Sequence, residues 1–171
     1  MKPSWRSAPA LAIVLLAAGL AGSCRAKTDR DLIAEVIDDM AAQVEKKKAA
    51  GLVAHLSQDY RDFEGRDREA TRAMAEDFFR RYRGIKARVL SSRILTGTGD
   101  APSADFDVAL YSGVGAALRK AVGFSGENYR VSCEFRREGA WRIASARWEY
   151  VPLEGLFPES LKILRELFPD L

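Results

Sequence analysis

The sequence is poor in the residues that metal centres and imidazole or thiol catalysis require. It contains one histidine, His55, and only two cysteines, Cys24 and Cys133. Zinc sites in proteins combine several cysteine and histidine ligands at short spacing, and this chain has no such cluster. We therefore expect no metal ion and no cofactor, and we interpret His55 as a structural or surface residue.

A concentrated basic face is also missing. The chain of 171 residues carries a net charge of +3, and residues 1–23 hold two of its basic residues, Lys2 and Arg6, and no acidic one. Without that segment the net charge falls to +1. Nucleic-acid binding requires a cluster of basic side chains on one face, so we expect no nucleic-acid partner.

No apolar run is long enough to cross a bilayer, but one near the start indicates export. Residues 10–22 are apolar and follow Lys2 and Arg6. A membrane span needs about 20 apolar residues, whereas a charged start with a shorter apolar run is typical of a secretion signal. Leu20 to Cys24, LAGSC, resembles a bacterial lipobox. The alternative is an ordinary signal peptide, because Ala21 and Ser23 also suit cleavage before Cys24.

The lipobox resemblance implies a cellular location. Residues 1–23 would be removed, Cys24 would carry a lipid, and residues 24–28 would tether a single domain at 29–171, whose last part, 152–171, is a tail. This tether reaches about 15 Å at most, so the domain would lie close to the membrane. The implied location is the cell envelope, facing the periplasm from the outer membrane. A lipidated Cys24 would leave Cys133 unpaired as a small buried residue, whereas a free Cys24 could form a disulfide with it.

Helical periodicity predicts two long helices in the first half of the chain. Thr28 can cap the first, which runs to about Lys48, and apolar residues recur every three or four positions along it. Lys46–Lys48 would form its solvated last turn; contact with lipid head groups is the alternative. A short helical turn (52–56), an extended piece (58–63) and a second helix (67–83) follow. Tyr60 and Phe63 from the extended piece and Phe79 from the second helix are candidates for the wall of a pocket.

From Ile85 the apolar pattern changes to a period of two, which predicts strands. We expect strands at 85–96 and 104–110, with a turn at 97–100. In the second strand Asp105 and Asp107 should point outward into solvent. Residues 111–126 would form a long connection, which could cover the mouth of a cavity. In the tail, Pro158 and the apolar residues that follow it predict a short helix that seals the sheet; a lid or a partner edge is the alternative.

The stretch 127–151 predicts a long β-hairpin. Only Gly139 accepts a positive φ at no steric cost, so we expect a three-residue loop at 137–139 with Arg136 paired to Ala140. In that register Phe135 lies opposite Trp141 and Cys133 opposite Ile143. Tyr129, Cys133, Ser145 and Arg147 would then face the core. Arg147 would pair either with an anionic ligand or with a structural carboxylate.

The order of these elements, together with LVAHLSQDY (52–60) and REGAWRI (137–143), resembles the nuclear transport factor 2-like superfamily. The resemblance implies an α+β fold in which a curved antiparallel sheet wraps around N-terminal helices, with a short C-terminal helix added. It also implies a pairing surface on the outer face of the sheet, and so a homodimer.

Enzymes that the fold resembles, such as isomerases and cyclases, use a buried carboxylate or a His–Asp pair. The predicted inner face carries no acid, His55 has no partner that the pattern identifies, and Asp59 lies in a turn or cap. The sequence therefore favours a non-catalytic module for a small apolar or anionic ligand or for protein assembly. An isomerase-like enzyme and a dimeric scaffold are the alternatives. The predicted pocket residues are Tyr60, Phe63, Phe79, Tyr129, Cys133, Ser145 and Arg147.

Overall fold

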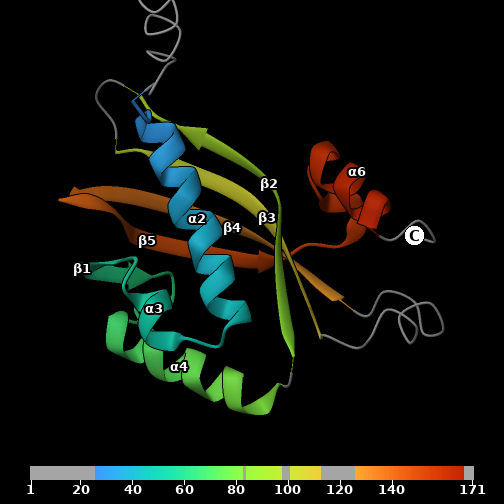
Figure 1. Ribbon diagram of the computed structural model, residues 1–171, viewed down its shortest axis with the longest axis horizontal. Coiled ribbons are helices and arrows are strands. Elements are labelled where there is room, and N and C mark those ends of the chain that lie inside the picture. The colour runs from blue at the N-terminus through green and yellow to red at the C-terminus, as the bar shows by residue number, and fades with distance from the viewer. Residues whose placement is uncertain (1–25, 83, 98–100, 113–125, 168–171) are drawn as a thin grey trace, which may run out of the picture.

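The computed structural model describes residues 26–82, 84–97, 101–112 and 126–167. Figure 1 shows helices gathered on one face of a curved sheet and a further helix beside the opposite face. The elements in chain order are α2 (Asp29–Glu45), α3 (Ala49–Val53), β1 (Leu56–Asp62), α4 (Arg68–Arg81), β2 (Ile85–Leu95), β3 (Ser103–Ser112), β4 (Gly126–Glu138), β5 (Ala140–Tyr150), the 3-10 turn η1 (Leu153–Gly155) and α6 (Pro158–Leu167).

The sheet has five strands in the order β1-β5-β4-β3-β2. The four long strands are antiparallel, as expected, and β1 adds a parallel strand beside β5. Helix α2 crosses the concave face of this sheet, and α3 and α4 lie near the C-terminal end of α2 (Figure 1). The α+β architecture predicted from the sequence is confirmed, with a mixed rather than fully antiparallel sheet.

Helix α2 begins as the sequence predicts. The Thr28 hydroxyl accepts the backbone N–H of Asp31, and the Asp31 carboxylate accepts the backbone N–H of Thr28, which forms a reciprocal capping box. Ile33 and Ile37 on its apolar stripe are buried against the sheet. The helix ends at Glu45, so Lys46–Lys48 do not form its last turn. Lys47 instead has a left-handed backbone (φ 55°), and its Nζ donates to the carbonyls of Phe79 and Tyr82 at the end of α4.

A tight turn connects β1 to α4. One oxygen of the buried Asp62 carboxylate accepts the backbone N–H groups of Glu64 and Arg66, both at 2.9 Å. Its other oxygen accepts Arg66 Nε at 2.6 Å. Gly65 supplies the positive φ (79°) that the turn requires. Asp67 then caps α4 by accepting the N–H of Ala70.

Strand β3 alternates as predicted, but its outer face is not solvated. Ala104 and Phe106 are buried in the main core beneath α2. Asp107 points to the opposite face and was expected in solvent, yet it is fully buried. That expectation was wrong because the C-terminal segment packs over this part of the sheet. Ala109 belongs there to a second apolar cluster, whose other buried members are Leu90, Val151, Leu156 and Leu164.

The predicted hairpin forms, with its turn at Gly139 (φ 74°), but in a different register. Phe135 pairs with Ile143 rather than Trp141, and Arg136 pairs with Arg142 rather than Ala140. A β-bulge follows, after which Cys133 pairs with Ala146 rather than Ile143. Phe135 and Trp141 still pack on the same core, as the sequence predicted. The bulge adds one residue to β5, and so it exchanges the two faces of that strand beyond Ile143.

The C-terminal tail forms the expected short helix, α6, which packs against β2 and seals the outer face. Ser160 of α6 lies 2.5 Å from Ser91 of β2, hydroxyl to hydroxyl. The expected signal segment, Cys24 and most of the connection at 111–126 lie outside the described residues. Among the residues that are described, no helix combines the length and apolarity that crossing a bilayer requires.

Candidate functional site

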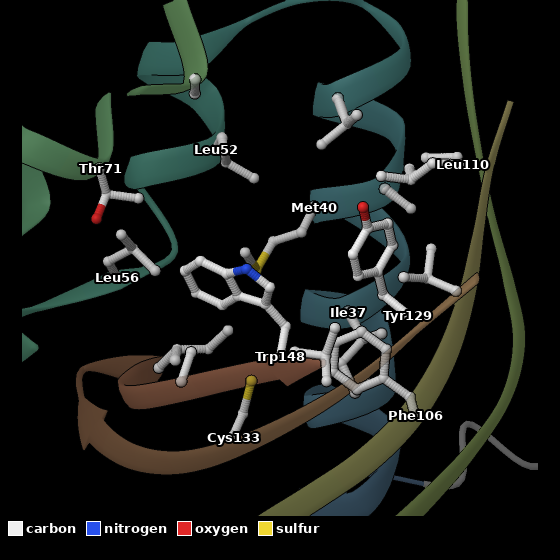
Figure 2. Close-up of a pocket in the computed structure, with 18 of the residues that line it drawn as sticks. Ile37, Met40, Leu52, Leu56, Thr71, Phe106, Leu110, Tyr129, Cys133 and Trp148 are labelled. Carbon is white, nitrogen blue, oxygen red and sulfur yellow. The ribbon is translucent and has the colours of Figure 1, made fainter. Parts of the chain in front are cut away.

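A cavity of about 380 Å³ lies between the helices and the concave face of the sheet (Figure 2). Helices α2, α3 and α4 form one wall, and side chains of all five strands, β1 to β5, form the other. The residues along it are Ile37, Met40, Ala41, Val44, Leu52, Leu56, Tyr60, Thr71, Met74, Ala75, Phe78, Phe79, Ala87, Val89, Phe106, Val108, Leu110, Tyr129, Val131, Cys133, Ile143, Ala146 and Trp148.

The wall of this cavity is almost entirely hydrocarbon. Within the described part of the chain, no carboxylate, imidazole, ammonium or guanidinium group lines it. Among the described lining residues, hydrogen-bond donors come from five side chains. These are the hydroxyls of Tyr60, Thr71 and Tyr129, the thiol of Cys133 and the indole nitrogen of Trp148. Such a site suits apolar molecules, because a buried charge without a partner would be strongly unfavourable.

The titratable groups on the wall stay protonated near neutral pH. Burial, reinforced by the charge of Asp105, raises the pKa of Cys133 to about 12. Burial and the hydrogen bond from the Tyr129 hydroxyl to Glu127 (2.5 Å) raise the pKa of Tyr129 to about 12. Burial also raises the pKa of Tyr60 well above its usual value. None of these groups is therefore a base at neutral pH.

Four of the sequence-predicted pocket residues, Tyr60, Phe79, Tyr129 and Cys133, lie along the cavity. The other three do not. Phe63 is half exposed beyond the end of β1, where its ring meets that of Trp148 edge-on. Ser145 and Arg147 lie on the outer face of β5, opposite Glu134 and Ser132.

The bulge in β5 explains the error at Ser145 and Arg147. It turns these two side chains outward and brings Ala146 and Trp148 into the cavity in their place. Ser145 donates to Glu134 (3.1 Å), and both predicted residues border a separate hollow of about 310 Å³ that mixes basic and acidic side chains. Arg147 is thus not positioned to hold an anion inside the cavity.

His55 has a partner that the sequence pattern did not identify. Its Nε2 lies 2.7 Å from Oδ2 of Asp39 in α2, and this contact lowers the pKa of Asp39. Neither residue lines the cavity. Asp59, the other candidate base, is largely exposed and ion-paired with Arg136 at 3.1 Å. Both groups therefore lie where a ligand in the cavity cannot reach them, and no group of metal-binding side chains occurs among the described residues.

No protein-family model and no curated protein sequence matches the chain. Solved structures do. A protein of unknown function with a cystatin-like fold from Nostoc punctiforme superposes with a TM-score of 0.57 at 17% identity, over 73% of this chain and 94% of its own. A nuclear transport factor 2-like protein of unknown function from Pseudomonas putida gives 0.55 at 15%, over 68% and 82%.

The chain has the nuclear transport factor 2-like fold. An enzyme has the same fold: hexachlorocyclohexane dehydrochlorinase LinA-type3 from Novosphingobium barchaimii superposes with a TM-score of 0.56 at 16% identity, over 74% of this chain and 91% of its own. At such low identity these likenesses establish the nuclear transport factor 2-like fold and leave the activity to be argued from the cavity.

Proposed function

We propose that this protein binds a small apolar molecule in the cavity between the helices and the sheet, and that it releases the molecule unchanged. The observation that carries the proposal is a space of about 380 Å³ whose described wall is hydrocarbon. Sites for small molecules measure roughly 300–1,000 Å³ and are lined mainly by apolar and aromatic side chains. Burying apolar surface is favourable by about 25 cal/mol per Å², so an apolar molecule of fitting shape gains free energy by leaving water.

The cavity supports binding better than catalysis. General acid–base catalysis requires a titratable side chain within hydrogen-bonding reach of the reacting atoms. The described wall offers only tyrosines and a thiol, and the pKa values of Tyr129 and Cys133 are raised to about 12. The pair formed by Asp39 and His55 lies outside the cavity. The dehydrochlorinase is similar in fold alone, so an isomerase-like reaction is the less supported alternative.

A dimer formed through the outer face of the sheet is also less supported. The C-terminal segment covers the part of that face where Leu90 and Ala109 are buried. The neighbouring outward residues of β4 and β5 are polar or charged, Ser132, Glu134 and Arg147 among them. Stable dimer interfaces have an apolar centre, whereas these outward positions of β4 and β5 are polar or charged.

We further propose that the protein works at a bacterial envelope, held by a lipid on Cys24. The support is the charged start, the short apolar run and the LAGSC segment. Mass spectrometry of the mature N-terminus provides the test. The proposal requires a diacylglyceryl group on Cys24 and the absence of residues 1–23. An unmodified Cys24, or cleavage at another position, would refute the anchor and leave the cavity proposal untouched.

Calorimetric titration with diphenylmethane, a neutral hydrocarbon of two rings, tests the binding proposal. Ala146→Leu adds volume to the cavity wall, whereas Ala140→Leu adds the same volume at an exposed position of the same strand. Overpacking costs about 1–3 kcal/mol, so we expect Ala146→Leu to weaken binding roughly 5- to 150-fold. Ala140→Leu should bind as the unaltered protein does. Equal weakening in both variants, or no binding by the unaltered protein, would refute the proposal.

A further inference from the structure

The two tryptophans that the structure describes differ in how their indole nitrogens are satisfied. Trp141 Nε1 donates to Oδ1 of Asp29 at 3.2 Å. Trp148 Nε1 has no acceptor among the described residues, although Trp148 lines the cavity. An indole N–H can only donate, so the Trp148 nitrogen is a hydrogen-bond donor on the cavity wall whose protein partner is missing from its described surroundings. The buried hydroxyl of Thr71, which also lines the cavity, likewise has no hydrogen-bond partner among the described residues.

The position of the Trp148 ring is fixed by its neighbours. The Phe63 ring meets it edge-on, with centroids 4.9 Å apart. The guanidinium of Arg66 lies 5.2 Å from the ring centroid, and Arg66 is itself held by the buried Asp62. In Figure 2 the indole projects from the sheet into the middle of the lining side chains, with its nitrogen on the ring edge nearest Met40 in this view. The N–H is therefore presented to whatever occupies the cavity.

The rest of the wall limits what that occupant can be. No cationic side chain lines the cavity in the described residues, so an anion inside it would have no partner. A pure hydrocarbon would shield the Trp148 N–H from water and give it nothing to bond with, which is unfavourable for a polar group. A neutral molecule with an acceptor at the right place avoids both costs.

Building on the proposed function, we propose that the ligand class is a neutral, mainly hydrocarbon molecule with one carbonyl or ether oxygen that accepts the hydrogen bond of Trp148 Nε1–H. This assigns Trp148 as the residue that orients the ligand. Apart from the hydroxyls and the thiol named above, the described wall supplies apolar contact, which is not directional.

A matched pair of compounds separates the hydrogen bond from apolar contact. Benzophenone differs from diphenylmethane only in having a carbonyl in place of the bridging methylene, and diphenylacetate adds a negative charge. Calorimetry would measure all three with the unaltered protein, Trp148→Phe and Trp141→Phe. In Trp148→Phe the affinity for benzophenone relative to diphenylmethane should fall roughly 2- to 12-fold. Trp141→Phe should leave that ratio unchanged, because its nitrogen lies at Asp29. Diphenylacetate should bind least tightly to every protein.

The outcomes are distinguishable. If diphenylmethane and benzophenone lose the same factor in Trp148→Phe, the ring only packs against the ligand and the inference is wrong. Binding of diphenylacetate as tight as that of benzophenone would also overturn it. If neither neutral compound binds the unaltered protein, the proposed function fails and the inference fails with it.

A spectrum of the unaltered, ¹⁵N-labelled protein gives a second readout that does not depend on the variant folding. Benzophenone should shift the indole N–H proton of Trp148 downfield by more than diphenylmethane does, and the Trp141 signal should stay in place. Equal shifts of the Trp148 signal with the two compounds would contradict the hydrogen bond.

Discussion

The carboxylate of Asp107 in β3 is fully buried and lies 2.9 Å from Nε and 3.3 Å from Nη2 of Arg130 in β4. The same carboxylate accepts the backbone N–H of Phe157 at 2.7 Å. Arg130 also donates to the carbonyl of Gly155 at 2.9 Å, and its guanidinium lies 3.8 Å from the Phe157 ring centroid. This ion pair thus attaches the C-terminal segment to the outer face of the sheet.

Removing the acid from this pair should destabilise the protein strongly. In Asp107→Ala the guanidinium of Arg130 loses its carboxylate partner in a partly buried place, which costs about 3–5 kcal/mol of the free energy of unfolding. Asp105→Ala on the same face is the control. Among the described residues Asp105 accepts the Ser132 hydroxyl (2.5 Å) and forms no ion pair, so this substitution should cost about 0.5–1.5 kcal/mol. Urea denaturation measures both. Equal losses would mean that the buried pair has no special role.

The turn at Asp62 should make stability depend on pH in acid. Burial raises the pKa of Asp62, but the hydrogen bonds from the Arg66 side chain and from the N–H groups of Arg66 and Glu64 outweigh it, so the net pKa is lowered. A lowered pKa in the folded state stabilises the protein above the unfolded value, near 3.9, and that contribution is lost as the pH falls through the folded value.

Asp62→Asn removes this contribution. At pH 7 the variant should lose roughly 1–3 kcal/mol of the free energy of unfolding, and its stability should fall less between pH 5 and pH 2 than that of the unaltered protein. Glu64→Gln serves as the control, because Glu64 is half exposed where it pairs with Arg66. Parallel pH profiles for Asp62→Asn and the unaltered protein would contradict the assignment.

The thiol of Cys133 should be unreactive while the protein is folded. Burial raises its pKa to about 12, and only the thiolate reacts with alkylating reagents. At pH 8 iodoacetamide should label Cys133 at least roughly a thousandfold more slowly in the folded protein than in urea. Peptide mapping by mass spectrometry separates Cys133 from Cys24. Labelling at similar rates in the two conditions would show that the reagent reaches Cys133 in the folded protein and that its thiol is ionised there.

The hairpin turn should depend on glycine for conformational reasons alone. Gly139 has φ 74°, and apart from its two chain neighbours no atom of a described residue lies within 4 Å of where a Cβ atom would be. Gly139→Ala should therefore cost about 1–2 kcal/mol of the free energy of unfolding through backbone strain. Gly97, where a Cβ would also be free of contacts and φ is not in the left-handed region, is the matched control. Gly97→Ala should be neutral or slightly stabilising, and thermal denaturation that ranks the two variants the other way would refute the argument.

Local patterns predicted most of the fold. The capping box at Thr28, the apolar stripe of α2 and the alternation in β3 and β4 are properties of neighbouring residues, and they predicted the elements and their order. Three features depend on contacts distant in sequence and could not be inferred in this way. Asp107 is buried because Phe157, fifty positions later, packs over it, and Asp39 meets His55 across α3.

The third feature, the bulge in β5, determines which residues of that strand face the cavity. Nothing in the residues at 143–146 marks an extra position, so simple alternation assigned Ser145 and Arg147 to the cavity. The signal that was present was Trp148: a large aromatic residue near the end of a strand is expected on the buried face, and placing it there would have required the observed shift in register.

Methionine methyl signals offer the most direct test of ligand binding in the cavity. The chain has three methionines, of which Met40 lies along the cavity wall and Met74 is partly exposed at its edge. With ¹³C-methyl labelling, addition of benzophenone should shift the Met40 signal and give nuclear Overhauser contacts between its methyl group and the aromatic protons of the ligand. If benzophenone binds but the Met40 methyl signal neither shifts nor shows such contacts, binding inside the cavity is contradicted.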